Sequence, residues 1–150
     1  MNNRIFNTTF EVSIRVLLYL SVANNQSLTL DNLVTADFIT TYSHEFGLSE
    51  LSLHGNHDFT FTEFSLRRNI VQNAIKALVL DNMIKVCQST SGFSYSITSQ
   101  GQSFCNDLKS DYAIEYRTHA ERTKKYMKTK TQKELLNLIT QEAVKSNRKG

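Results

Sequence analysis

The sequence predicts a mainly α-helical protein with a small β-hairpin, arranged as a winged helix-turn-helix with a C-terminal helical extension. Apolar residues recur at helical spacing in three successive segments of the first 80 residues. Directly after the third segment, MIKVCQSTSGFSYSIT contains two strand-like runs joined by the polar turn QSTSG. Three helices followed by a hairpin is the order of elements in a winged helix.

The first helix is expected over about residues 9–23. Thr8 followed by Glu11 is a capping-box pattern, which satisfies free amides at a helix start. The apolar residues expected to face the core are Phe10, Ile14, Leu17, Leu18 and Val22, with Val12, Val16 and Leu20 widening that face. A helix that is apolar almost all round should lie at the centre of the domain.

Two further helices are expected, separated by an irregular insert over residues 43–64. Thr29 should cap LDNLVTADFITTY, and Ser65 should cap SLRRNIVQNAIKALVLDN, which ends at Asp81 and Asn82. In the third helix the residues predicted to point inward are Leu66, Ile70, Val71, Ala74, Ala77 and Leu78. Those predicted to point outward are Arg68, Asn69, Gln72, Asn73 and Lys76. An insert of this length is either functional or packed as its own lobe.

The predicted wing spans residues 83–98, with Gly92 in its turn. Its apolar residues alternate so that one face, expected to join the core, carries Ile84, Val86, Phe93, Tyr95 and Ile97. A helix is expected over QSFCNDLKSDYAIEYRTHAERTKKYM and another over TQKELLNLITQEAV, joined by KTKTQK. We therefore divide the chain into a winged-helix domain, residues 1–108, and a helical extension, residues 109–150.

Charge is distributed unevenly between these two parts. Residues 1–108 carry six Lys and Arg against nine Asp and Glu, a net charge of −3, whereas residues 109–150 carry eleven against five, a net charge of +6. An anionic partner would therefore meet the C-terminal third of the chain.

No catalytic motif is recognisable. The chain has no GxSxG, no HExxH and no glycine-rich phosphate loop. His44, His54 and His57 lie near Glu45 and Asp58, but their spacing favours polar loop histidines over a metal site. The sequence thus predicts no enzyme, no cofactor, no metal and no small-molecule substrate.

Two cysteines and one apolar run bear on the compartment. Cys87 and Cys105 are expected to be reduced thiols, and Cys87 is interpreted as a buried core residue, with a Cys–His nucleophile pair as the weaker alternative. The most apolar run, VLLYLSVA, is too short to cross a bilayer, and the N-terminus lacks the pattern of a secretion signal. We expect a cytoplasmic protein.

Two sets of residues are candidates for nucleic-acid contact. On the third helix they are Arg68, Gln72 and Lys76, and in the basic extension Lys124, Lys125 and Lys128. QSTSGFSYSIT contains no Lys or Arg, so a solvated or protein-contacting face is favoured over sequence-specific reading by the third helix. For the extension, a solvated face, a nucleic-acid contact and an acidic protein groove all remain open.

The extension also supplies the candidate partner interface. Aromatic, basic and apolar residues recur there on what should be one side of each helix: Tyr112, Tyr116, Arg117, Leu135, Leu138 and Ile139. A small domain has little surface with which to bury the apolar stripe of the last helix, which favours burial against a partner.

Several sequence blocks resemble a known family. They are LDxLVxxDF from Leu30 to Phe38, the LH pair at Leu53 and His54, the block from Arg67 to Ile84, and SDYAxxYRxxA from Ser110 to Ala120. In order and spacing, over about residues 6–127, the chain resembles the middle component of bacterial three-component systems built around an SMC-like ABC ATPase. That group includes the small C subunit of Lamassu-type anti-phage and anti-plasmid defence.

The resemblance implies a non-enzymatic adaptor that bridges an SMC-like ABC ATPase dimer and an effector nuclease. It implies at most an auxiliary, non-specific DNA contact and no membrane. The alternative is a winged-helix DNA-binding transcriptional regulator, dimeric through its C-terminal helix, which should bind one operator-like sequence tightly.

Overall fold

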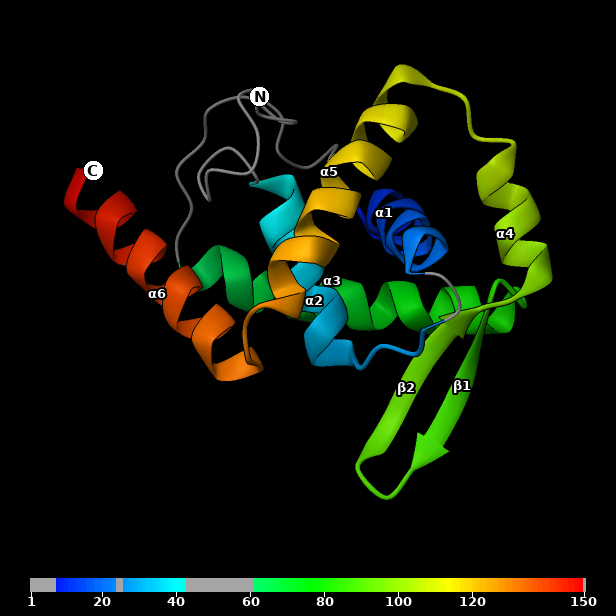
Figure 1. The fold of residues 1–150 in the computed structure, drawn as a ribbon, viewed down its shortest axis with the longest axis horizontal. Helices are drawn as coiled ribbons and strands as arrows, with labels where there is room; N and C mark the ends of the chain where they lie inside the picture. The colour runs from blue at the N-terminus through cyan, green and yellow to red at the C-terminus, as the bar shows by residue number, and fades with distance from the viewer. Residues whose placement is uncertain (1–7, 24–25, 43–60, 150) are drawn as a thin grey trace.

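A computed structural model describes residues 8–23, 26–42 and 61–149, and its elements confirm the mainly helical fold with a hairpin (Figure 1). In chain order they are α1 (Thr9–Val22), α2 (Leu30–Thr41), α3 (Phe61–Leu80), β1 (Ile84–Ser89), β2 (Gly92–Ile97), α4 (Ser99–Asn106), α5 (Asp111–Lys128) and α6 (Gln132–Lys149). The expected insert falls mostly in residues 43–60, outside the described residues.

Helix α1 lies at the centre of the molecule, as predicted, and packs against α2, α3, α4 and α5. Its N-cap is Thr8, whose hydroxyl accepts a hydrogen bond from the Glu11 amide at 3.2 Å. Phe10 was expected in the core but is 73% exposed. It lies in the first turn, whereas Val12, Val16 and Leu20 are almost completely buried. Helical spacing alone does not reveal where packing partners begin along a helix.

Helix α2 is capped as predicted. The Thr29 hydroxyl accepts from the Asn32 amide at 3.1 Å, while the Asn32 side chain accepts from the Thr29 amide at 3.4 Å. From Leu33 to Thr41 every residue of α2 is buried. Such complete burial places the lone carboxylate of Asp37 inside the protein.

Helix α3 begins at Phe61, so the predictions that Ser65 caps it and that the irregular insert reaches residue 64 are wrong. Leu66, expected inside, is 56% exposed, and the neighbouring Arg67 is buried instead. Arg67 is buried because it meets a carboxylate on α2. The helix ends as predicted: Asn82 adopts a φ of 60°, and the Met83 amide bonds the Leu78 carbonyl at 2.9 Å.

The hairpin pairs Ile84 with Ile97, Val86 with Tyr95 and Gln88 with Phe93. On the other edge of β2, Leu28 exchanges two backbone hydrogen bonds with Tyr95, at 2.9 and 2.8 Å. A strand residue between α1 and α2 that pairs with the hairpin is compatible with a winged helix.

The expectation that the whole apolar face of the wing joins the core is wrong. Ile84 and Ile97 at its root are buried, but Val86 is 46% and Phe93 56% exposed. The hairpin projects away from the helices, so only its root reaches them (Figure 1). Its tip therefore presents apolar side chains to the surroundings.

The helix expected over residues 102–127 is two helices, α4 and α5, with a break around Asp107 to Ser110. Thr98 caps α4 and Ser110 caps α5, each hydroxyl accepting from an amide three residues ahead. Helix α5 then packs against α1 and α2. The division of the chain at residue 108 into two domains stays a prediction.

Within the described ranges, no helix is both long and apolar enough to span a membrane.

Candidate functional site

A buried ionic cluster joins four helices at Asp37. Arg15 on α1 donates from Nε to Asp37 Oδ1 at 2.8 Å and from Nη2 to Oδ2 at 3.1 Å. Arg67 on α3 donates from Nη1 to Oδ2 at 2.5 Å, and Tyr116 on α5 donates to Oδ1 at 2.8 Å. All four side chains are at most 4% exposed. We call these residues, Arg15, Asp37, Arg67 and Tyr116, the Asp37 cluster.

The cluster sets the ionisation of its members. Burial alone would raise the pKa of Asp37, but the charges of Arg15 and Arg67 and the hydrogen bonds from Arg15 and Tyr116 hold it well below its usual value. For Arg15 burial acts in the opposite direction and would lower the pKa, but the negative charge of Asp37 outweighs burial and the pKa of Arg15 rises. The pKa of Tyr116 is raised, by burial and by the Asp37 charge. The cluster is therefore a fixed set of charges with Asp37 ionised.

The contacts of the Asp37 cluster hold helices together. The guanidinium of Arg67 also lies over the rings of Phe38 and Tyr42, with its carbon 5.3 and 5.7 Å from their centroids. One carboxylate thus ties α1, α3 and α5 to α2, and the blocks LDxLVxxDF, Arg67–Ile84 and SDYAxxYRxxA meet in it. Sequence reasoning missed the cluster. The signal was present, because Arg15 and Asp37 are isolated charges in apolar runs, IRVLLYL and VTADFI.

The predicted DNA-reading face of α3 is exposed, but its arginine has a partner. Arg68, Gln72 and Lys76 all lie on the outer surface. Arg68 Nη1 forms an ion pair with Asp31 of α2, and both side chains are about half exposed. Asp31 therefore lies beside Arg68, the only arginine among the three predicted contacts, and reduces the positive charge available there to bind phosphate.

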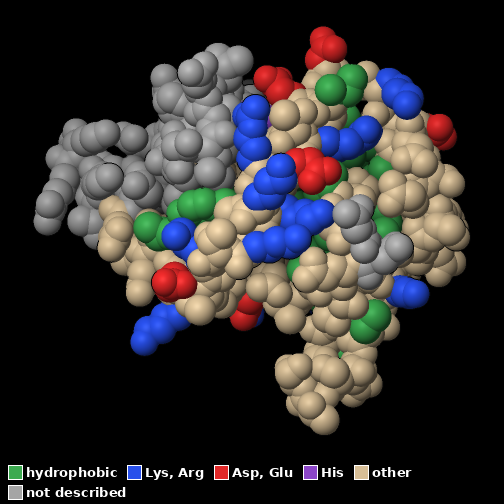
Figure 2. Space-filling view, in the orientation of Figure 1, with side chains coloured by type: hydrophobic (Ala, Val, Ile, Leu, Met, Phe, Trp, Pro, Cys, Tyr) green, Lys and Arg blue, Asp and Glu red, His purple; other side chains and the backbone are tan. Residues whose placement is uncertain are grey.

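The basic residues predicted in the extension lie along α5. Lys125 and Lys128 are exposed, whereas the half-buried Lys124 donates from Nζ to the Val22 carbonyl, at the end of α1, at 2.9 Å. A cation at a helix C-terminus stabilises its free carbonyl groups. Figure 2 shows Lys and Arg side chains gathered over α5, with an acidic side chain among them.

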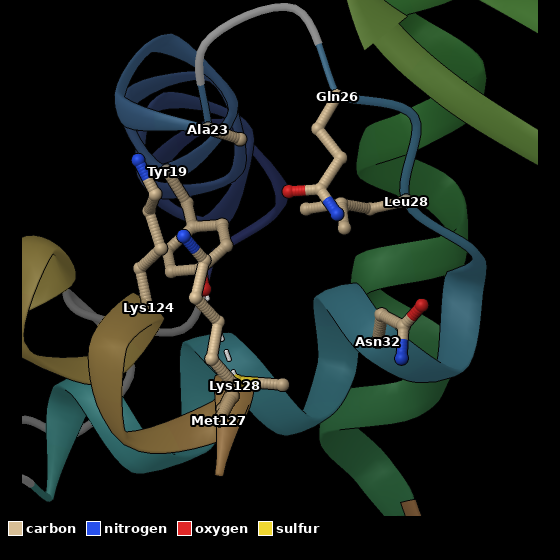
Figure 3. Close-up of a pocket in the computed structure, with 8 residues that line it drawn as sticks. All are labelled: Tyr19, Ala23, Gln26, Leu28, Asn32, Lys124, Met127 and Lys128. Carbon is tan, nitrogen blue, oxygen red and sulfur yellow. Dashed lines mark hydrogen bonds between the residues drawn. The ribbon is translucent and has the colours of Figure 1, made fainter. Parts of the chain in front are cut away.

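A hollow of about 180 Å³ borders this basic surface. Its walls come from α1, the segment before α2, the start of α2, and α5 (Figure 3). The lining residues are Tyr19, Ala23, Gln26, Leu28, Asn32, Lys124, Met127 and Lys128. The Tyr19 hydroxyl donates to Met127 Sδ at 3.8 Å. The principal polar groups of the hollow are then the two lysines and the side-chain amides of Gln26 and Asn32.

The predicted partner-interface residues are mostly engaged within the chain itself. Tyr116 belongs to the Asp37 cluster, Leu135 and Ile139 are 2% and 4% exposed, and Leu138 is half-buried. Near them, Gln132 of α6 donates to Thr35 Oγ1 at 3.0 Å. Their role as partner anchors stays a prediction.

Two further predicted interface residues, Tyr112 and Arg117, have identifiable structural contacts. Arg117 donates from Nη2 to the carbonyls of Cys105 and Leu108, both at 2.6 Å, and so fastens the end of α4 to α5. The half-buried Tyr112 stacks on Tyr116, with ring centroids 6.2 Å apart, and burial raises its pKa to about 12. Both contacts stabilise the start of α5.

The cysteines are free thiols in different environments. Cys105 is buried, but Cys87 is half-exposed in β1, so its interpretation as a buried core thiol is wrong. It lies on the outer face of the strand, 3.4 Å from the Ser27 hydroxyl, which lowers its pKa. His44, His54 and His57, the histidines considered for a metal site, fall outside the described residues.

Comparison with known protein families places nearly the whole chain in one of them. The family model described as ABC-three component (ABC-3C) system Middle Component 2 matches residues 5–149. The comparisons with curated proteins and with solved structures found no match.

Proposed function

This chain belongs to the middle component 2 family of ABC-three component systems, and from that premise we propose that it is a non-enzymatic cytoplasmic adaptor. Its proposed partners are an SMC-like ABC ATPase dimer and an effector nuclease, which it bridges. The observation that carries the proposal is the family match over residues 5–149, nearly the whole chain. A Lamassu-type system, directed against phage and plasmids, is part of the proposal and rests on the motif resemblance.

The surface chemistry of the wing supports an adaptor. Val86 and Phe93 are exposed on one face of the hairpin, where Tyr95 pairs with Val86 and lies two residues from Phe93 along β2. Lys85 is the one cation within β1 and β2. Apolar side chains with few charges are typical of the centre of a protein interface and weak at binding phosphate. We propose that this face contacts another component of the ABC system.

The interior also supports an adaptor. The Asp37 cluster fixes α1, α2, α3 and α5 against each other, so the wing, which follows α3, projects from a rigid support. A rigid support favours an adaptor, because flexible binding surfaces lose conformational entropy on each binding event.

Co-expression with the neighbouring genes tests the proposal. We expect the tagged chain to bring the ATPase through affinity and size-exclusion steps at moderate salt. The variant Val86→Ser/Phe93→Ser should lose that partner, whereas Leu80→Ser, which changes an 82% exposed apolar residue of α3, should keep it. A chain that elutes alone at moderate salt contradicts the adaptor function.

The transcriptional regulator remains the second candidate, because the polar face of α3 is exposed. It predicts that Gln72→Ala relaxes base preference at one position of an operator, by about 1–3 kcal/mol. Equal binding to scrambled duplexes would exclude this candidate and leave the adaptor.

A further inference from the structure

We propose that the basic half of α5, with the hollow beside it, binds the phosphodiester backbone of nucleic acid without regard to sequence. We call this surface, formed by Lys124, Lys125 and Lys128 with the hollow of Figure 3, the α5 basic surface. The inference goes beyond the adaptor function and does not rest on it, because the purified chain alone should show the binding.

The first observation is the charge. From Arg122 to Lys133 the chain carries six Lys and Arg and no Asp or Glu, whereas residues 1–108 carry a net charge of −3. This polarity orients an anionic polymer toward α5 and away from the rest of the protein. Figure 2 shows Lys and Arg side chains gathered on one side of the molecule, with an acidic side chain among them.

The second observation is that the surface is hollowed and its cations are positioned. Lys124 and Lys128 are one helical turn apart, about 6 Å along the axis, and both line the hollow. The bond from Lys124 Nζ to the Val22 carbonyl, 2.9 Å long, holds one ammonium in place and leaves its other protons for a ligand. The side-chain amide of Gln26, on the opposite wall, adds a further hydrogen-bonding group.

The third observation separates nucleic acid from an acidic protein. Protein interfaces have an apolar centre surrounded by polar residues. Among the described residues between 115 and 135, no large apolar side chain is exposed. The exposed side chains of this surface are polar or charged, whereas Tyr19, Ala23, Leu28 and Met127 lie buried or half-buried in the hollow. Such a surface suits a polyanion whose charge is regularly spaced, because most of the binding free energy then comes from released counterions.

The test is fluorescence anisotropy with a labelled, scrambled duplex of about 20 base pairs, titrated between about 50 and 200 mM salt. If Lys124, Lys125 and Lys128 each neutralise one phosphate, the plot of log K against log salt should have a slope of about −2.7. Affinity should then fall about 40-fold over that range. Single-stranded DNA and duplex RNA of the same length, run in parallel, identify which polymer is preferred.

Variants assign the binding to α5. Lys125→Gln and Lys128→Gln change exposed side chains, and each should reduce the slope by about one and weaken all sequences equally. Lys85→Gln on the wing, also exposed, is the matched control and should leave the slope unchanged, and Lys76→Gln tests the alternative contact on α3. Circular dichroism melts verify that each variant is folded.

Three results would overturn the proposal. One is a slope that does not change in Lys125→Gln/Lys128→Gln. Another is an equal loss in Lys76→Gln, which would move the site to α3. The third is competition by poly-L-glutamate as strong as that by unlabelled DNA at equal charge, which would assign the surface to an acidic protein.

Discussion

Replacing Asp37 with Asn should destabilise the protein severely, because it leaves two buried guanidinium groups without their carboxylate. Asn keeps the shape of the side chain but not its charge, so Arg15 and Arg67 would remain desolvated and uncompensated. Removing one partner of a buried ion pair costs about 3–5 kcal/mol. Small domains are stable by only about 5–15 kcal/mol in total. The loss should therefore be a large part of the free energy of unfolding.

The chain offers a matched control on the same helix. Asp31 also pairs with an arginine of α3, but that pair is about half exposed to solvent. Surface ion pairs contribute about 0–1 kcal/mol, so Asp31→Asn should be nearly neutral. Urea unfolding followed by circular dichroism measures both variants. With a slope near 2 kcal/mol/M, the midpoint of Asp37→Asn should fall by about 2 M.

Acid titration adds an independent readout. The pKa of Asp37 in the folded protein lies below its value in the unfolded chain, which is about 3.9. The ionised carboxylate therefore contributes its full share of the free energy of unfolding above about pH 3.9, and this share is lost as the pH falls toward the folded-state pKa. The wild-type protein should lose this contribution in acid, and Asp37→Asn should not. A stability loss in Asp37→Asn within about 1 kcal/mol of that in Asp31→Asn would refute the reasoning.

Three other predictions concern single positions. Gly101→Ala should lower the unfolding temperature, because a Cβ there would collide with the Met83 carbonyl oxygen and lie 2.9 Å from Ile97 Cγ1; the cost of such overpacking is about 1–3 kcal/mol by calorimetry. Burial lowers the pKa of His119, so stability should be greatest above about pH 6.5 and decline below it as the unfolded chain takes up the proton; His119→Gln should flatten that part of the urea-midpoint profile. A thiol reagent should label Cys87 in the folded protein and Cys105 only after unfolding, and equal labelling rates would contradict the packing of α4.

The sequence predicted well those features that depend on neighbouring residues. The caps at Thr8 and Thr29, the end of α3 at Asn82 and the position of the hairpin all follow from side chains within a few positions of each other. Such interactions are local, so their pattern is readable without the fold.

Features that depend on packing between distant elements were harder to predict. Phe10 and Phe93 are spaced like core residues, yet Phe10, in the first turn of α1, and Phe93, near the tip of the wing, are both exposed. Periodicity identifies the apolar face of a helix or strand, but it does not show how much of that face packs against other elements.

The buried ionic cluster shows the same difficulty in the candidate site. Arg15 and Asp37 are 22 positions apart and Tyr116 lies 79 positions from Asp37, so nothing local indicates that they meet. The helical spacing of Tyr112 and Tyr116 predicts a partner interface for Tyr116, whereas the structure places its hydroxyl on Asp37. Charged residues are usually solvated, and only their isolation in apolar runs hinted otherwise.

Bridging is the central claim, and a three-way reconstitution tests it most directly. The ATPase carries the affinity tag, and recovery of the untagged effector is measured with and without this chain. We expect the amount of effector recovered with the ATPase to rise with the amount of this chain added, until it saturates at a fixed ratio of chain to ATPase. The variant Val86→Ser/Phe93→Ser should recover no effector. Equal recovery of the effector in the absence of the chain would contradict bridging.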